Sequence, residues 1–193
     1  MNDVPPVEIG RLRADEWRAY RALRLRALAD EPLAFGSEYY IEESRTDAGW
    51  QDLADRFARS EQQRLYVARA EGQLIGMVGA KLDPTPNRMH IATVVSVFVV
   101  PERRGEGISR HLMDALLADL QQVPYLRKVR LNVNPDQTPA IGLYESAGFR
   151  IVGRLEAELR IGEAYVDIVL MEKKLHTVAP SPRDSFHRHP EDS

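Results

Sequence analysis

An apolar run and an amphipathic helix are joined by the segment Val99-Val-Pro-Glu-Arg-Arg-Gly-Glu-Gly-Ile-Ser109. The run itself, His90 to Val100, is β-branched and almost wholly apolar, which predicts a strand buried on both faces at the centre of a sheet. Pro101 ends this strand. Strand, glycine turn and helix form the first half of a βαβ unit, so Lys128 to Asn132 is predicted to be the parallel strand that completes it. The helix is recognised from apolar positions at helical spacing, namely Ile108, Leu112, Ala115, Leu116 and Leu120.

The turn in this segment contains two glycines, Gly105 and Gly107, directly before the helix. Glycines let the backbone approach a ligand without a Cβ in the way, and the helix start offers unsatisfied N–H groups to an anion. This favours a phosphate ligand, although a purely structural turn uses the same residues. The Gly-Lys-Ser/Thr ending of a Walker motif and the third glycine of the dinucleotide fingerprint are both missing, so ATP and NAD are poor candidates.

Two helices are expected before the sheet. The first follows Asp15, a candidate N-cap, and ends before Glu31-Pro32. Its Arg18, Arg21 and Arg24 are expected on a solvated face, with an anionic-ligand site as the alternative. The second is capped by Thr46 and has an apolar face. That face consists of Trp50, Leu53, Ala54, Phe57 and Ala58.

The remaining elements are read from alternating patterns and turn residues. Leu65 to Ala70 and Leu74 to Leu82 are predicted to form a hairpin around Glu71-Gly72. A short helix is expected from Pro139 to Ser146, with Gly148 near its end. The last predicted elements are a hairpin of Phe149 to Arg160 and Tyr165 to Lys173 around Gly162, followed by a disordered tail over residues 176–193.

Composition limits the possible functions. The chain has 193 residues, a formal net charge of −3 and no cysteine. The absence of cysteine excludes a disulfide framework, a thiolate zinc site and a cysteine nucleophile. The pair His187 and His189 in the tail has no acidic partners and predicts no metal site. The balanced charge gives no reason to expect nucleic acid as a partner, and no apolar run is long enough to cross a membrane. We therefore expect a cytoplasmic protein that acts on a small molecule or on another protein.

Two segments resemble the motifs of the GNAT superfamily of acyl-CoA-dependent N-acetyltransferases. Arg104-Gly105-Glu106-Gly107-Ile108-Ser109 is similar to the family's pyrophosphate loop, Arg/Gln-x-x-Gly-x-Gly/Ala, in its arginine, both glycines and the aliphatic residue. Ala140-Ile141-Gly142-Leu143-Tyr144-Glu145-Ser146-Ala147-Gly148-Phe149 looks like the family's Ala-x-x-Leu-Tyr-x-x-x-Gly-Phe helix. The motifs stand in the family's order, and the resemblance covers roughly residues 7 to 175.

The resemblance implies a fold. It is a three-layer α/β (α+β mixed) fold, in which a mixed, mostly antiparallel sheet of about seven strands has helices on both faces and a splayed parallel pair in the middle. Residues 1–175 would form one N-acetyltransferase domain, with 176–193 as the tail. A homodimer is a further expectation by analogy with the family.

The resemblance also implies the site. Backbone groups of the central strand would bind the pantetheine of acetyl-CoA and polarise its thioester carbonyl, and the N–H groups of the glycine loop would bind the pyrophosphate. Gln137 occupies the position where the family often has an asparagine that contacts CoA. The expected donor-binding residues are Val97, Phe98, Val99, Arg104, Gly105, Glu106, Gly107, Ile108, Ser109 and Gln137. Arg103 and Arg110 are candidates for additional positive charge.

Because the chain has no cysteine, the acceptor amine is expected to attack the thioester directly in a ternary complex. Tyr144, at the family's Leu-Tyr position, is the candidate general acid that protonates the leaving thiolate. The base is left open, because Asn132 stands where some relatives have a glutamate. Other groups that could assist through water are Glu38, Glu42, Glu43, His90 and Ser96.

Three functions remain open at this level. The first is acetyl transfer to a primary amine of a small molecule, and the second is acetyl transfer to a protein N-terminus or a lysine. The third, from another class, is a non-catalytic acyl-CoA-binding or sensing module, which would keep the glycine loop but would not need Tyr144.

Overall fold

The computed structural model describes residues 6–32, 39–161 and 163–175. The strands of this part form one mixed sheet in the order β1-β2-β3-β4-β5-β7-β6, in which every neighbouring pair is antiparallel except β4 and β5. The strands are β1 (Glu8–Arg11), β2 (Gln63–Ala70), β3 (Gln73–Leu82), β4 (Ile91–Val99), β5 (Lys128–Val133), β6 (Arg150–Ile161) and β7 (Ala164–Lys174). The predicted parallel pair and central strand are therefore confirmed.

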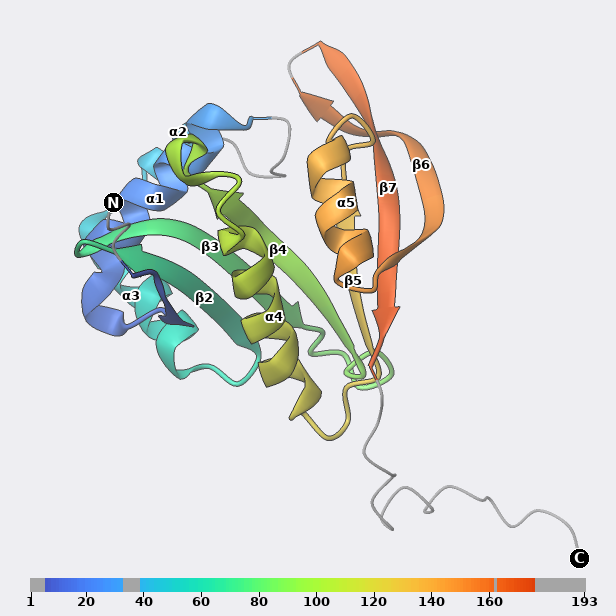
Figure 1. The fold of residues 1–193 in the computed structure, drawn as a ribbon, viewed down its shortest axis with the longest axis horizontal. Coiled ribbons are helices and arrows are strands. Elements are labelled where there is room, and N and C mark those ends of the chain that lie inside the picture. Colours follow the sequence, from blue (N-terminus) through green and yellow to red (C-terminus); the bar gives the residue numbers. More distant parts are fainter. Residues whose placement is uncertain (1–5, 33–38, 162, 176–193) are drawn as a thin grey trace, which may run out of the picture.

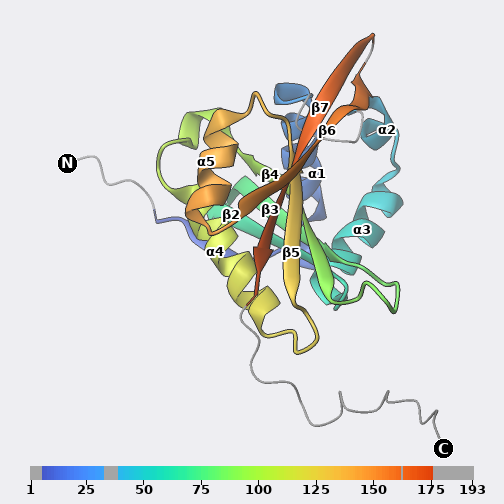
Figure 2. The same cartoon turned by 90° about the vertical axis from the view of Figure 1, so that its right-hand side faces the viewer.

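Helices cover both faces of the sheet. Figure 2 shows α4 and α5 on one side of it and α1, α2 and α3 on the other. Their bounds are α1 (Trp17–Asp30), α2 (Tyr39–Glu43), α3 (Asp47–Arg59), α4 (Ile108–Gln121) and α5 (Thr138–Ser146). The expected mixed fold with helices on both faces is thus observed.

The α1–α3 layer is held together by aromatic packing. Thr46 caps α3 as predicted, because its hydroxyl accepts a hydrogen bond from the Gly49 N–H at 3.2 Å. The rings of Trp50 and Phe57 each lie 5.8 Å from the ring of Tyr20 on α1, in edge-to-face geometry. This buried cluster fixes α1 and α3 against the same face of the sheet.

Two expectations for α1 are wrong. Asp15 is not the N-cap, because residues Ala14–Glu16 form a 3₁₀ turn and α1 begins at Trp17. Glu16 instead accepts a hydrogen bond from the Arg13 N–H at 2.8 Å. Arg24 does not lie on a solvated face but is buried, with 7% of its surface exposed. α2 lies beside this position of α1, where its Glu42 carboxylate is 3.7 Å from the Arg24 guanidinium, so Arg24 is buried although the helical period places it among polar residues.

β4 contains a bulge in its second half. Met77 pairs with Phe98 and Gly79 pairs with Val95, so one residue of β3 faces two residues of β4. Ser96 lies in this bulge with φ +57°, in the left-handed region. Gly79 of β3, the partner of Val95, has little room for a side chain, because an added Cβ would lie 3.0 Å from the carbonyl oxygen of Arg64 on β2.

The parallel pair splays apart beyond the first part of β4. β4 and β5 pair only at Ile91 with Lys128, Ala92 with Val129 and Thr93 with Arg130. The rest of β5 pairs with β7 alone. Figure 1 shows the resulting gap, with β1 to β4 on one side and β5, β7 and β6 on the other.

Replacing Ser96 by valine is expected to destabilise the protein by about 1–3 kcal/mol, because a β-branched residue is strained at positive φ. Glycine at the same position carries no such strain and provides the matched control. Denaturant unfolding of both variants measures the difference. Equal stability of the valine and glycine variants would show that the bulge geometry imposes no strain.

Some sequence predictions lie outside the described residues. Gly162, at the centre of the last hairpin, and the tail 176–193 belong to this group. The hairpin strands on either side of Gly162 are observed as β6 and β7. Within the described ranges, no helix has the length and apolar character needed to cross a membrane.

Candidate active site

The splay between β4 and β5 separates two cavities that meet at shared residues. One, of about 670 Å³, is lined by the end of β4, the glycine turn and α5, and we call it the donor cavity. The other, of about 630 Å³, extends over β3, β4 and β5 toward α2 and α3, and we call it the acceptor cavity. Val97, Gln137 and Tyr144 line both. The two cavities therefore adjoin at the gap between β4 and β5.

The bulge in β4 points backbone groups into the donor cavity. The Val100 N–H donates to the Ile75 carbonyl of β3, at 3.0 Å. Because successive residues of a strand direct their backbone groups to opposite edges, Val99 and Val97 face away from β3. The Val99 carbonyl accepts from the Arg104 guanidinium at 3.1 Å, which agrees with this direction. The Val97 N–H therefore faces the β5 side of β4.

The glycine turn has the geometry of an anion site. Gly105 and Gly107 have φ of +84° and +78°, which glycine adopts without strain. An added Cβ at Gly105 would meet no heavy atom within 4 Å, so this face of the turn opens into the cavity. Arg110 and His111 donate their N–H groups to the Gly107 carbonyl, which begins the bonding of α4. The N–H groups before them have no helical acceptor and suit a pyrophosphate.

Three arginines line the donor cavity, Arg103, Arg104 and Arg110, and each forms an ion pair with a carboxylate. Besides its bond to Val99, Arg104 forms an ion pair with Glu31 at 3.0 Å. Arg110 bonds Asp114 at 3.0 Å and also the Ser146 hydroxyl on α5, which ties α4 to α5 across the cavity. These guanidinium groups supply positive charge beside the glycine turn.

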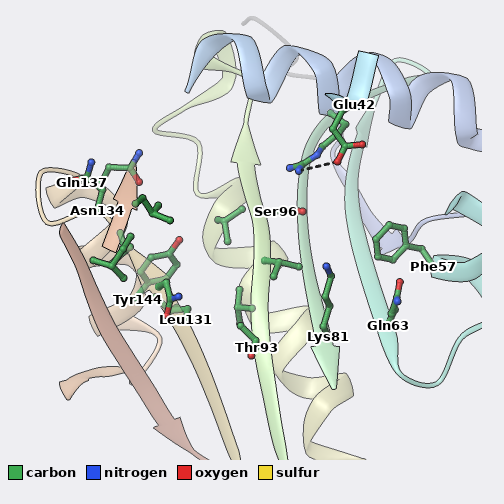
Figure 3. Close-up of a pocket in the computed structure, with 18 of the residues that line it drawn as sticks. Glu42, Phe57, Gln63, Lys81, Thr93, Ser96, Leu131, Asn134, Gln137 and Tyr144 are labelled. Carbon is green, nitrogen blue, oxygen red and sulfur yellow. Dashed lines mark ion pairs between the residues drawn. The ribbon is translucent and has the colours of Figure 1, made fainter. Parts of the chain in front are cut away.

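Tyr144 lies in the wall between the two cavities. Its side chain comes from α5, is 6% exposed and packs edge-to-face on Phe149, with ring centroids 6.2 Å apart. Figure 3 shows its hydroxyl turned toward the gap between β5 and β4. Burial raises the pKa of Tyr144 to about 12. The phenol therefore keeps its proton at neutral pH, which is the state required of a general acid.

The acceptor cavity has a charged end formed by α1 and α2. Glu42 is bound by Arg45 at 2.9 Å and lies 3.7 Å from the buried Arg24 (Figure 3). On the cavity floor, Lys81 of β3 lies between Gln63 of β2 and Thr93 of β4, which are its partners in strand register.

The structure brings most of the predicted site residues together. Lining the donor cavity are Val97, Phe98, Val99, Arg104, Gly105, Gly107, Ile108, Ser109, Gln137 and Tyr144. Glu106 lies in the same turn, but its carboxylate bonds the Arg103 guanidinium at 2.8 Å and does not line the cavity.

The residues that could help to remove the proton of the amine do not all lie in the acceptor cavity. Glu42 and Ser96 line the acceptor cavity. Asn132, which stands where some relatives have a glutamate but is not itself a candidate base, lines it as well. Glu43 is exposed and its carboxylate accepts from the Tyr39 hydroxyl, while His90 precedes β4 at the end where β4 and β5 are still paired. Glu38 is outside the described residues.

Sequence analysis missed the cations of the acceptor cavity. Arg24 was expected in solvent, and neither Lys81 nor Arg45 was expected in a site. Lys81 is the ninth residue of β3 and is exposed, although the six residues before it, 75–80, are all buried. A search for charged residues within apolar strands would find this position.

Comparison with known proteins agrees with this geometry. The sequence model of the Acetyltransferase (GNAT) family matches residues 16–149. The mycothiol acetyltransferase of Salinispora tropica is 31% identical over 131 residues, which are 68% of this chain and 40% of that protein. The L-amino acid N-acetyltransferase AaaT of Escherichia coli is 27% identical over 164 residues, 84% of this chain and 96% of that protein.

The likeness extends to solved structures. The acetyltransferase of GNAT family from Streptococcus pneumoniae superposes with a TM-score of 0.79, at 22% identity, over 89% of this chain and 100% of that one. The chain spans about two fifths of the length of the mycothiol acetyltransferase that it matches. The matched residues 16–149 contain the glycine turn, the splayed strands and Tyr144. The chain therefore belongs to the GNAT family of acetyltransferases, whose acyl donor is acetyl-CoA.

Proposed function

We propose that this chain transfers the acetyl group of acetyl-CoA to a primary amine of a small molecule. The observation that carries the proposal is the meeting of the two cavities at Val97, Gln137 and Tyr144. One cavity has the anion-binding turn that the donor requires, and the other has room for a second molecule. The acceptor cavity is bounded by α2, α3 and β6 as well as by the sheet, which favours a small acceptor over a protein chain.

The donor is expected to lie with its pyrophosphate at the glycine turn and its acyl end in the gap between β4 and β5. The N–H groups around Gly105 and Gly107 would hold the pyrophosphate, and Arg104 or Arg110 would add charge. The Val97 N–H would donate to the thioester carbonyl oxygen, where negative charge develops during attack. These groups bind and orient the donor, and acetyl-CoA supplies the activated acyl group.

The transfer is a direct displacement. The acceptor nitrogen forms a bond to the acetyl carbon, the carbon–sulfur bond breaks, and the sulfur leaves as a thiolate. Tyr144 gives its phenolic proton to that sulfur, because the phenol is protonated at neutral pH and lies between the cavities. The amine loses its proton to water in the acceptor cavity, and the Tyr144 phenolate regains a proton from water, which restores the phenol for the next turnover. No acyl-enzyme is formed, in agreement with the absence of cysteine.

Release of free CoA thiol from acetyl-CoA, in the presence of a panel of amines, tests the proposal. The panel contains amino acids, aliphatic polyamines, aryl-alkyl amines and short peptides with a free N-terminus. We expect turnover of small amines that exceeds turnover of the peptides. Turnover of peptides alone would replace the small acceptor by a protein acceptor. Acetyl-CoA binding without turnover of any amine would point to the non-catalytic module.

A further inference from the structure

Strand β6 contains a wide bulge, residues 156–158, beside the acceptor cavity. Its pairing with β7 passes from Leu155 to Leu159, so the three bulge residues face only Asp167. The middle one, Ala157, has φ of +52°, a conformation that residues other than glycine rarely adopt. The third, Glu158, lines the acceptor cavity. Bulges next to active sites commonly change the direction of a side chain, and here the side chain that follows the strained residue is that of Glu158.

The β6 bulge is held by the carboxylate of Asp167 on β7. One oxygen accepts a hydrogen bond from the Ala157 N–H at 2.9 Å, and the other accepts from the Arg154 guanidinium at 2.6 Å. These two donors hold the pKa of Asp167 below its ordinary value, so its carboxylate is charged at neutral pH. A left-handed alanine costs free energy and persists only where the surrounding contacts determine it. The contacts of Asp167 therefore fix the backbone that carries Glu158.

Glu158 supplies the acceptor cavity with a carboxylate that has no cation of its own. Among the described lining residues, the other carboxylate is Glu42, which is bound by Arg45 at 2.9 Å and lies 3.7 Å from Arg24. Within residues 6–32, 39–161 and 163–175, the Glu158 carboxylate takes part in no ion pair. Its negative charge is thus available to a cation of the ligand.

The charges on the two sides of the sheet gap favour the same direction. Lys81 is on β3, whereas Glu158 is on β6, beyond β5 and β7 in the sheet order (Figure 1). In the part of the chain that the structure describes, Lys81 also takes part in no ion pair, whereas the lining Arg56 pairs with Asp52 at 3.1 Å. The field of the two unmatched charges drives a cation away from β3 and toward β6. A cationic acceptor is therefore drawn across the gap between β4 and β5.

We propose that Glu158 binds the ammonium form of the acceptor and orients it toward the gap, and that Asp167 positions Glu158 for this role. An aliphatic primary amine carries a proton at neutral pH, so the acceptor enters the cavity as a cation. The amine then gives its proton to water and attacks the thioester, as in the proposed function, on which this inference rests. Glu158 acts on acceptor binding, and protonation of the leaving thiolate stays with Tyr144.

The test uses Glu158→Gln, which removes the charge and keeps the size of the side chain. Glu156→Gln is the matched control, because Glu156 belongs to the same bulge, is also exposed and lines neither cavity. The acceptors are benzylamine, which is an ammonium at neutral pH, and aniline, which is neutral there and lacks one CH₂ group. Each acceptor is titrated into the protein saturated with CoA, and steady-state kinetics give KM and kcat where acetylation occurs.

We expect Glu158→Gln to weaken benzylamine binding and to raise its KM about five- to tenfold, with kcat changed by less than about twofold, since the lost contact is one ion pair to an exposed carboxylate. Aniline carries no charge for Glu158 to bind, so its binding should change by less than about twofold. As the pH rises through the pKa of benzylamine, the difference between variant and wild type should disappear. A wild type that does not bind benzylamine, an equal loss for both acceptors, or an equal loss in Glu156→Gln would overturn the assignment.

The positioning role is tested with Asp167→Ala. This variant should raise the KM for benzylamine about as much as Glu158→Gln does, and it should add little when the two changes are combined, because it acts through the Glu158 carboxylate. It should leave aniline binding unchanged. Losses that add in the double variant would show that Asp167 acts independently of Glu158 and would contradict this role.

Titration separates this inference from the proposed function, because binding does not depend on turnover. If benzylamine binds through Glu158 but no amine of the panel is acetylated, the ammonium site stands and the transferase proposal fails. If amines are acetylated while Glu158→Gln changes neither the binding nor the KM of benzylamine, the transferase stands and the role of Glu158 fails.

Discussion

An aspartate at Gly105 or Gly107 is expected to weaken acetyl-CoA binding by at least about 100-fold. Each substitution places a carboxylate where the pyrophosphate would lie, and each forces a side chain onto a backbone with positive φ. Loss of one or two charge-assisted hydrogen bonds, at roughly 1.5–3 kcal/mol each, already accounts for a change of this size. Isothermal titration with acetyl-CoA measures it.

The control for this experiment is Gly72→Asp. Gly72 lies in the hairpin between β2 and β3, has φ of +74° and, like Gly105, would place a Cβ within 4 Å of no heavy atom. It lines neither cavity. The control variant therefore has the same backbone strain and the same added charge, and it should bind acetyl-CoA as the wild type does. If Gly105→Asp and Gly107→Asp also bind normally, the turn is only structural.

Tyr144→Phe is expected to lower kcat by about 100-fold or more, because loss of a general acid typically costs 10²–10⁴ in rate. The variant keeps the ring and its packing on Phe149, so the dissociation constant of acetyl-CoA should stay within about threefold of the wild-type value. Steady-state kinetics and titration calorimetry separate the two effects. A non-catalytic acyl-CoA-binding module would lose nothing from this substitution.

The pH profile gives an independent check on Tyr144. Its pKa is raised to about 12 by burial, so the acid form persists across the alkaline range. The wild-type kcat should therefore not decline between pH 8 and 10 through loss of this proton.

The control for Tyr144→Phe is Tyr66→Phe, which alters a half-buried tyrosine outside both cavities and should leave kcat unchanged. A loss of rate in Tyr66→Phe equal to that in Tyr144→Phe would assign the effect to packing.

Local patterns were sufficient for the parts of the fold whose residues are close in sequence. The βαβ unit from β4 through α4 to β5 is encoded by one apolar run, one glycine turn and one amphipathic helix. The hairpin at Glu71-Gly72 is likewise local, because both residues take positive φ in the turn. The glycine turn and Tyr144 were found for the same reason, since each belongs to a short motif.

Features that depend on long-range pairing were not predicted. β1 has four residues, too few for a periodic pattern, and is formed by its pairing with β2. The row of Gln63, Lys81 and Thr93 comes from three strands, and its register is set by the bulge at Ser96 and by the hairpin turn. Arg24 lies three residues after Arg21, at a position that the helical period assigns to the solvated face. It is nevertheless covered by α2, an element that sequence analysis did not predict.

The central claim is that donor and acceptor meet in the gap between β4 and β5, beside Tyr144. A crystal structure of this chain with acetyl-CoA tests it most directly. We predict pyrophosphate oxygens within hydrogen-bond distance of the N–H groups from Gly105 to Ser109, a thioester carbonyl that accepts from the Val97 N–H, and a sulfur that faces the Tyr144 hydroxyl. An acyl group bound outside the gap, or a Tyr144 hydroxyl turned away from the sulfur, would contradict the claim.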